Sequence, residues 1–303
     1  MAYSNVAVVP ATPDHSAFLA QVVLSASRSQ LTRGPFDVAL ELSDGEMLDI
    51  LEWMTLSELD SNCHFTKFLV AEVDGEPVGA LAAFDPAEPD MLPLGAALSD
   101  AYTGLGHDEA ELGEVIGRIE ALRRCFPTAP PGTWTVEWVS VDAAHRRRGV
   151  CAKLMKEILA KGAERGLRKA QISTYVGNES AIKTYERAGF RVESERRDPK
   201  FSSVLGVPGM ITMLRNVFGF TLLIVAAAEC GRLASGPFPS RVPGSGPRNR
   251  GLPACKQRQR ASTGQRRGNV LHPKLEVVDH AARSYVDLAL FLLCGIGARR
   301  FGY

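Results

Sequence analysis

A run of three arginines followed by a glycine, at residues 146–149, has residue types that could bind a charged ligand. Arg146, Arg147 and Arg148 precede Gly149, and a helical apolar pattern starts at Val150. The first N–H groups of a helix have no internal partners and the helix dipole is positive there, so this arginine turn (residues 146–149) could bind phosphate. Gly149 lets the backbone approach an anion, and guanidinium groups offer paired donors to phosphate oxygens. The alternative is a basic, solvated surface without a ligand.

A second motif, from Asn178 to Phe190, contains a phenol that could donate a proton. Asn178 is suited to cap a helix and Gly189 to end it. Tyr185 belongs to the apolar stripe of this helix, whose members are Ala181, Ile182, Tyr185 and Ala188. A tyrosine on such a stripe is either a core residue or a buried acid.

The two motifs need strands and helices to position them. The apolar run 134–141 predicts a strand before the arginine turn, and the alternation in 169–176 predicts another before Asn178. Upstream, Asp74-Gly75 between two apolar runs predicts a hairpin over 68–84. Other expected elements are a strand at 5–9, a helix to about residue 27, a helical pattern over 36–59, a helix at roughly 107–125 and strands at 191–197 and 209–214, with a loop at 198–208 between the last two.

Together the two motifs resemble the GNAT superfamily of N-acetyltransferases, in the order and at about the distance that the family uses. Its acyl-CoA-binding turn, Arg/Gln-x-x-Gly-x-Gly/Ala, is similar to residues 146–151, where Cys151 replaces the final small residue. Its second half-motif is similar to residues 178–190. The resemblance implies an α/β fold, with a mixed, mostly antiparallel central sheet of about six to seven strands flanked by helices.

The resemblance also implies acetyl-CoA as co-substrate, with no metal. The turn would hold the pyrophosphate, through Arg146, Arg147, Arg148, Gly149, Val150, Cys151 and Ala152. The backbone near Val139 and Val141 would pair with the pantetheine arm and polarise the thioester carbonyl. Asn178 is where the family often places another contact to the donor.

Two residues are candidates for proton transfer. A phenol has a pKa of about 10 and a thiol about 8.5, so Tyr185 starts protonated and could serve the departing sulfur as general acid. Glu137 lies two and four residues before Val139 and Val141, and strand alternation would place it on their face as general base. A partly buried, hydrogen-bonded glutamate is the alternative for Glu137.

Cys151 invites a covalent mechanism, because helix N-termini lower thiol pKa values. Direct transfer needs no acyl-enzyme, and no nearby histidine has the context of a base, so we favour direct attack. We expect His145 to be a turn residue beside phosphate or solvent.

Charge divides the chain near residue 216. Residues 217–303 contain 13 Lys/Arg and 4 Asp/Glu, which leaves 22 of the 35 basic and 30 of the 34 acidic residues to the front, or about +9 against −8. We predict an acetyltransferase domain over 1–216, with an insertion at about 85–132 that is a peripheral elaboration or a lid beside the acceptor site. Residues 217–303 are predicted to be an irregular, largely disordered basic tail, because apolar runs too short to span a bilayer flank a Gly/Pro/Arg-rich link.

The sequence predicts an N-acetyltransferase that moves an acetyl group from acetyl-CoA to a primary amine. The alternative is a non-catalytic acyl-CoA-binding sensor or interaction module. The expected partner is a small-molecule or peptide amine, with no nucleic acid and no stable membrane span; a homodimer is left open. A further alternative is that the basic tail contacts nucleic acid or a membrane. Six scattered cysteines without CxxC spacing and a start unlike a signal peptide favour a cytoplasmic protein with reduced thiols.

Overall fold

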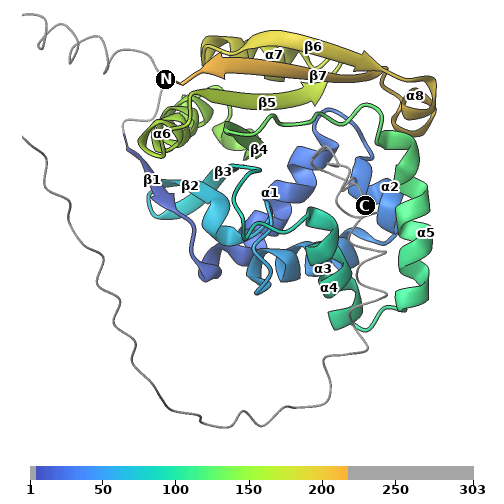
Figure 1. The fold of residues 1–303 in the computed structure, drawn as a ribbon. Helices are drawn as coiled ribbons and strands as arrows, with labels where there is room; N and C mark the ends of the chain where they lie inside the picture. Colours follow the sequence, from blue (N-terminus) through green and yellow to red (C-terminus); the bar gives the residue numbers. More distant parts are fainter. Residues whose placement is uncertain (1–4, 218–303) are drawn as a thin grey trace, which may run out of the picture. The chain divides into compact units, whose positions relative to one another are not determined.

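A seven-stranded sheet organises residues 5–217, which are the residues described by this computed structural model. The strands lie in the order β1-β2-β3-β4-β5-β7-β6 (Figure 1). Neighbouring strands are antiparallel except β4 and β5, which run parallel. The predicted mixed, mostly antiparallel sheet is thereby confirmed. The strand bounds are β1 Val6–Pro10, β2 Phe68–Val73, β3 Glu76–Phe84, β4 Thr133–Val141, β5 Lys169–Tyr175, β6 Arg191–Arg197 and β7 Gly209–Asn216.

Alternation along the central strands sends their side chains into two hydrophobic cores, one on each face of the sheet. In β2, Phe68 and Val70 belong to the core that α1 to α5 cover, whereas Leu69 and Ala71 belong to the core that α6 and α7 cover. Figure 1 shows α1 to α5 gathered together below β5, β6 and β7. The helix bounds are α1 Ser16–Arg28, α2 Pro35–Leu40, α3 Asp44–Leu56, α4 Leu94–Gly104, α5 Glu109–Ile119, α6 Val150–Glu164, α7 Glu179–Arg187 and α8 Pro199–Leu205.

The helical pattern at 36–59 is split between α2 and α3. α2 ends where Glu41 adopts a left-handed conformation with φ of 54°. α3 starts with a capping box, in which Ser43 accepts the Glu46 N–H and the Glu46 carboxylate accepts the Ser43 N–H. Apolar spacing did not reveal the break, because both helices bury their apolar residues in the same core.

The insertion at 85–132 contributes to the core as well as to the surface. α4 was not predicted, and α5 begins at Glu109 rather than at the expected residue 107. Leu98, Ala101 and Leu122 are buried in the core of α1 to α5. The loop predicted at 198–208 contains the short helix α8, whose cap Asp198 accepts the N–H groups of two following residues.

Within residues 5–217, no helix is long and apolar enough to cross a membrane. The same residues hold no group of three or more His, Cys, Asp or Glu side chains placed to bind a metal ion. The last strand ends at Asn216, where the sequence predicted the domain to end. The predicted tail lies outside the described residues from residue 218 onward.

Candidate functional site

The parallel strands β4 and β5 pair over only part of their length and then separate. Their ladder runs from Thr133 opposite Lys169 to Val136 opposite Ile172. Beyond these residues the two strands continue without pairing to each other. The opening between them is a pocket, which we call the split-strand pocket.

Five regions of the chain line the split-strand pocket. β4 and β5 form two sides, and the end of α1 with the start of α2 forms a third. Phe126 from the insertion and Tyr185 from α7 complete the lining. Its members are Ala26, Ser27, Ser29, Pro35, Phe36, Phe126, Val136, Glu137, Trp138, Val139, Ile172, Ser173, Thr174, Tyr175 and Tyr185. The structure thus brings both predicted proton-transfer residues, Glu137 and Tyr185, to one pocket.

A bulge in β4 corrects the predicted orientation of Glu137. Opposite β3, Glu137 pairs with Ala82 and Ser140 pairs with Ala80, so two residues of β4 oppose one of β3. Trp138 at the bulge has φ of 53°, which is uncommon for a bulky residue. Glu137 therefore shares a face with Ala82 in the core of α1 to α5, whereas Val139 and Val141 face α6 and α7. The prediction of one shared face was wrong, because the extra residue shifts the alternation.

The Glu137 carboxylate is held inside the protein and reached through the pocket. Protein atoms surround it on most sides, although the side chain keeps some exposed surface. Asn62 Nδ2 donates a hydrogen bond of 2.7 Å to Glu137 Oε2, and the Trp138 indole N–H donates to the Asn62 carbonyl at 3.1 Å. Burial raises the pKa of Glu137 to about 7, although the Asn62 bond acts in the opposite direction. Such a carboxylate can accept a proton near neutral pH.

Tyr185 lines the same pocket from α7 with only 8% of its surface exposed. Its ring packs edge to face on Phe190, with the ring centroids 6.5 Å apart. The hydroxyl makes no hydrogen bond to any of residues 5–217, so it is open to a group in the pocket. Burial, and then proximity to Cys151, raises the pKa of Tyr185 well above its ordinary value. The phenol is therefore neutral at physiological pH and has a proton to give.

Asn178 caps α7 and ties it to two neighbouring segments. Its side-chain oxygen accepts the Ala181 N–H at 3.1 Å, as the sequence predicted for a cap. Its amide nitrogen donates to Ser29 Oγ at 2.8 Å and to Thr174 Oγ1 at 3.1 Å. Both amide protons are thereby used inside the protein. Asn178 positions the helix that carries Tyr185, and its predicted contact to the donor remains a prediction.

The arginine turn links the end of β4 to α6. Gly149 is the residue before the helix, with φ of 88°, and no side chain caps this helix N-terminus. The three arginines are exposed, and Arg146 Nε donates to the Val141 carbonyl at 2.8 Å. The first turn of α6 contains no acidic residue. The turn therefore offers backbone N–H groups and positive charge to an anion.

Cys151, in the first turn of α6, does not have the properties of a nucleophile. It packs against the core of α6 and α7. Burial raises the pKa of its thiol to about 11, which leaves almost no thiolate at neutral pH. His145 lies in the turn that precedes the arginines, with its ring nitrogen 3.4 Å from Asp142.

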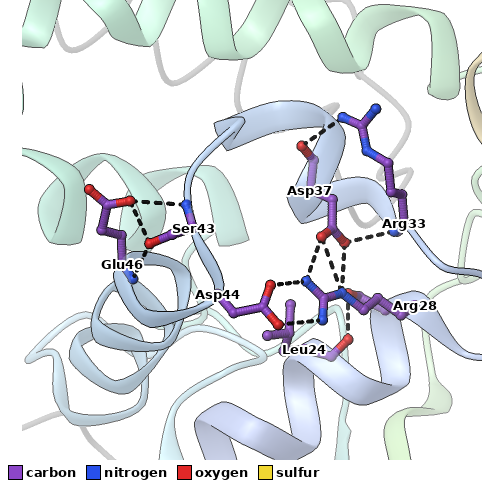
Figure 2. Close-up of polar contacts among 9 residues, drawn as sticks. Leu24, Arg28, Arg33, Asp37, Ser43, Asp44 and Glu46 are labelled. Carbon is purple, nitrogen blue, oxygen red and sulfur yellow. Dashed lines mark hydrogen bonds and ion pairs between the residues drawn. The ribbon is translucent and has the colours of Figure 1, made fainter.

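A charged cluster fixes the wall of the pocket that α1 and α2 provide (Figure 2). Arg28, at the end of α1, bonds both carboxylate oxygens of Asp37 in α2 and both of Asp44 in α3. Asp37 also accepts the Gly34 N–H at 2.7 Å. Burial would raise the pKa of Asp37, but the Arg28 guanidinium and the Gly34 N–H outweigh it and hold the pKa below its usual value. We call Arg28, Asp37 and Asp44 the arginine clamp; it holds the segment that carries Phe36.

The motifs did not identify several residues of the site. Asn62 precedes the hairpin in a segment without a recognisable pattern, yet it is the hydrogen-bond partner of Glu137. Phe36 and Trp138 form an aromatic wall with ring centroids 6.0 Å apart. Phe36 had been assigned only to a helical pattern, and Trp138 only to a strand. Their proximity depends on the bulge and on the clamp, for which the sequence carries no local signal.

Comparisons with known proteins bear on the family and the fold. The family model described as the acetyltransferase (GNAT) family matches residues 34–190. A solved acetyltransferase structure shares the fold with a TM-score of 0.51 at 18% identity, covering 70% of this chain and 100% of the other. An N-acetyltransferase from Staphylococcus aureus Mu50 gives a TM-score of 0.49 at 19% identity, covering 69% and 100%. No curated protein matches the chain.

The matched region, 34–190, contains the bulged strand, the arginine turn and the Tyr185 helix. It covers more than half of the sequence, and family membership indicates acyl transfer from acyl-CoA. The chain belongs to the GNAT family of acetyltransferases.

Proposed function

We propose that the protein is an N-acetyltransferase that moves the acetyl group of acetyl-CoA to a primary amine by direct attack in a ternary complex. One observation carries this proposal. A carboxylate with a pKa of about 7 and a neutral, buried phenol line the same pocket, at the point where β4 and β5 separate. A base for an ammonium and an acid for a leaving thiol are the two groups that this reaction needs.

The donor would lie along β4 and end at the arginine turn. Its diphosphate would meet the first N–H groups of α6 and the guanidinium groups of Arg146, Arg147 and Arg148. Beyond Val136 the edge of β4 has no partner strand on the β5 side within the described sheet. The backbone near Val139 and Val141 is therefore available to pair with the pantetheine arm and to polarise the thioester carbonyl. Cys151 and Ala152 would contribute backbone N–H groups, and Asn178 would hold α7 in place.

In the proposed reaction, Glu137 accepts a proton and Tyr185 donates one. The ammonium of the acceptor gives one proton to Glu137, and the neutral amine nitrogen attacks the thioester carbonyl carbon. A C–N bond forms and the C–S bond breaks, and Tyr185 gives its proton to the departing sulfur. Tyr185 regains a proton from the new amide nitrogen through water, and Glu137 releases its proton to solvent. The products are an N-acetyl amide, the free thiol and one proton.

The decisive measurement is thiol release from acetyl-CoA in the presence of a panel of amines, together with a titration of acetyl-CoA binding. We expect both binding and amine-dependent thiol release. A non-catalytic acyl-CoA sensor, the second candidate, would bind acetyl-CoA but release no thiol above the rate without protein. Absence of acetyl-CoA binding would reject both candidates.

Three expectations from the sequence accompany this proposal. They are a small-molecule or peptide amine as acceptor, a cytoplasmic location and a reaction that needs no metal. A homodimer stays open. Thiol release that is unchanged by a metal chelator would support the last of the three.

A further inference from the structure

The chemistry of the split-strand pocket restricts which amines can reach Glu137. We propose that the acceptor is a primary amine with an aromatic or branched apolar body and without a carboxylate group. This inference rests on the proposed N-acetyltransferase function and specifies its substrate class.

The side of the pocket beside Glu137 is aromatic. The rings of Phe36 and Trp138 lie 6.0 Å apart and tilted by 31°. Phe126 lines the pocket from the insertion and packs edge to face on Phe201 of α8, with centroids 6.3 Å apart. A fixed aromatic wall favours an apolar body, because contact with the wall removes apolar surface from water.

Three polar side chains of the pocket lining, those of Trp138, Tyr175 and Ser27, are already bonded to the protein. The Trp138 indole N–H donates to the Asn62 carbonyl, and the Tyr175 hydroxyl donates to the Ser27 carbonyl at 2.7 Å. The Ser27 hydroxyl donates to the Leu24 carbonyl at 2.9 Å. These side chains therefore have few hydrogen bonds left for a hydroxyl-rich ligand, such as an amino sugar.

Charge favours a cation and disfavours an anion. Glu137 is the only carboxylate among the described residues that line the pocket, and none of them is a lysine, an arginine or a histidine. An acceptor carboxylate would therefore enter a partly buried site that already holds a like charge. An ammonium would instead find the Glu137 carboxylate as its partner.

Two arginines adjacent to residues of the pocket lining do not change this conclusion. Arg28 lies between the pocket residues Ser27 and Ser29, but its guanidinium is engaged by the carboxylates of Asp37 and Asp44. Arg196 donates to the Phe126 carbonyl at 2.9 Å and to Thr128, and it is not part of the pocket lining. Neither is placed to bind the carboxylate of an amino acid at the attacking nitrogen.

The test uses the full chain and acceptors that differ in one group. Thiol release is measured with phenethylamine, phenylalanine, phenylalaninamide and glucosamine, and each rate is referred to the concentration of neutral amine. We expect kcat/KM for phenethylamine to exceed that for phenylalanine by at least about 100-fold, with phenylalaninamide within about ten-fold of phenethylamine. Equal or better use of phenylalanine or glucosamine would overturn the inference while leaving the proposed function intact. Acetyl-CoA binding without thiol release for any amine would overturn both.

Variants of the wall supply a second readout. Phe36→Leu should raise KM for phenethylamine several-fold without changing the Kd for acetyl-CoA, because it shortens the aromatic wall only. Phe18→Leu is the matched control, since Phe18 packs on the same core but does not line the pocket. Equal effects of the two variants on KM would contradict the proposal that the aromatic wall binds the acceptor. Thermal unfolding of both proteins checks that each is folded, and Phe36→Tyr, which keeps the ring, should retain the KM of the parent.

Discussion

Strand β4 leads toward the arginine turn at one end and forms one side of the split-strand pocket, but the turn and the pocket are built in opposite ways. The turn is contiguous in sequence and exposed, and it offers mainly backbone N–H groups and positively charged side chains. The pocket combines residues from Ala26 to Tyr185, and its proton-transfer groups are enclosed by protein. Binding of an anion tolerates solvent and depends on local backbone geometry. Shifting a pKa requires burial, which only distant segments can supply together.

The strongest test of this contrast is Tyr185→Phe. Loss of a positioned general acid typically lowers a rate by about 10²- to 10⁴-fold, so kcat should fall by that factor. The Kd for acetyl-CoA should stay unchanged, because the hydroxyl has no role in the arginine turn. Tyr102→Phe is the control, since the Tyr102 hydroxyl bonds Glu111 away from the pocket. Equal kcat for the Tyr185 variant and the parent would remove the phenol from the mechanism.

Changing the turn should affect affinity rather than chemistry. Charge-assisted hydrogen bonds are worth about 1.5–3 kcal/mol, so Arg147→Gln together with Arg148→Gln should raise the Kd for acetyl-CoA by at least about ten-fold. At saturating acetyl-CoA, kcat should be close to that of the parent. Lys156→Gln, an exposed charge farther along α6, serves as control. S-acetylpantetheine lacks the diphosphate, so the double variant should bind it as well as the parent does. If the double variant lost as much affinity for S-acetylpantetheine as for acetyl-CoA, the assignment of the turn would be wrong.

Glu137→Gln should change the dependence of rate on pH. With a pKa of about 7, the carboxylate becomes available as a base as pH rises through 7, so the parent should gain activity from pH 6 to 8. The variant should have a lower rate and should lose the increase in rate that Glu137 causes between pH 6 and 8. The remaining pH dependence should be that of the titrating amine itself. Profiles of kcat/KM from pH 5.5 to 9 would measure the difference. Two profiles of the same shape would exclude Glu137 as the base.

The same substitution should stabilise the protein at alkaline pH. Because the folded-state pKa of Glu137 lies above its ordinary value of 4.5, folding is disfavoured once the unfolded chain ionises, and the cost grows between about pH 4.5 and 7. Above pH 7 the cost is complete and amounts to at most about 3 kcal/mol. Thermal unfolding should therefore show a higher Tm for Glu137→Gln at pH 8 and a similar Tm at pH 4. A lower Tm at pH 8 would mean that the carboxylate is structural.

The smallest effect is expected from the arginine clamp. Asp37→Asn weakens its bonds to Arg28 and should cost about 1–2 kcal/mol of folding free energy at pH 7. Since the pKa of Asp37 is lowered in the fold, its contribution is present above the unfolded pKa and is lost as pH falls through the folded value. KM for the amine should rise a few-fold, because the segment that carries Phe36 would be held less firmly. Asp44→Asn, at an exposed position, should lower the folding free energy by less. A larger loss for Asp44→Asn than for Asp37→Asn would contradict the proposed role of the clamp.

Much of the fold was predictable from local patterns. Asp74-Gly75 fixed the hairpin of β2 and β3, and Asn178 and Gly189 marked the ends of the α7 motif. The break between α2 and α3 was not predictable, because apolar spacing continues across it. α4 was missed for a related reason: its segment follows a Pro-rich stretch and presents small apolar residues without a distinctive signature.

The candidate site divides in the same way. Arg146 to Ala152 could be assigned from sequence, because a helix start, a glycine and basic residues act through neighbours along the chain. Glu137 could be proposed as a base, but its orientation could not, since one extra residue in β4 moves it to the other face of the sheet.

By itself, the sequence determined the strand–turn–helix unit that can hold an anion and the helix that carries Tyr185. Only the tertiary structure decided that Glu137, Tyr185 and the aromatic wall of Phe36 and Trp138 share one pocket. The physical reason is the sequence separation of the residues that interact. Capping and backbone conformation are set by neighbours a few residues away. Burial, and the pKa values that follow from it, depends on segments more than a hundred residues apart meeting where β4 and β5 separate.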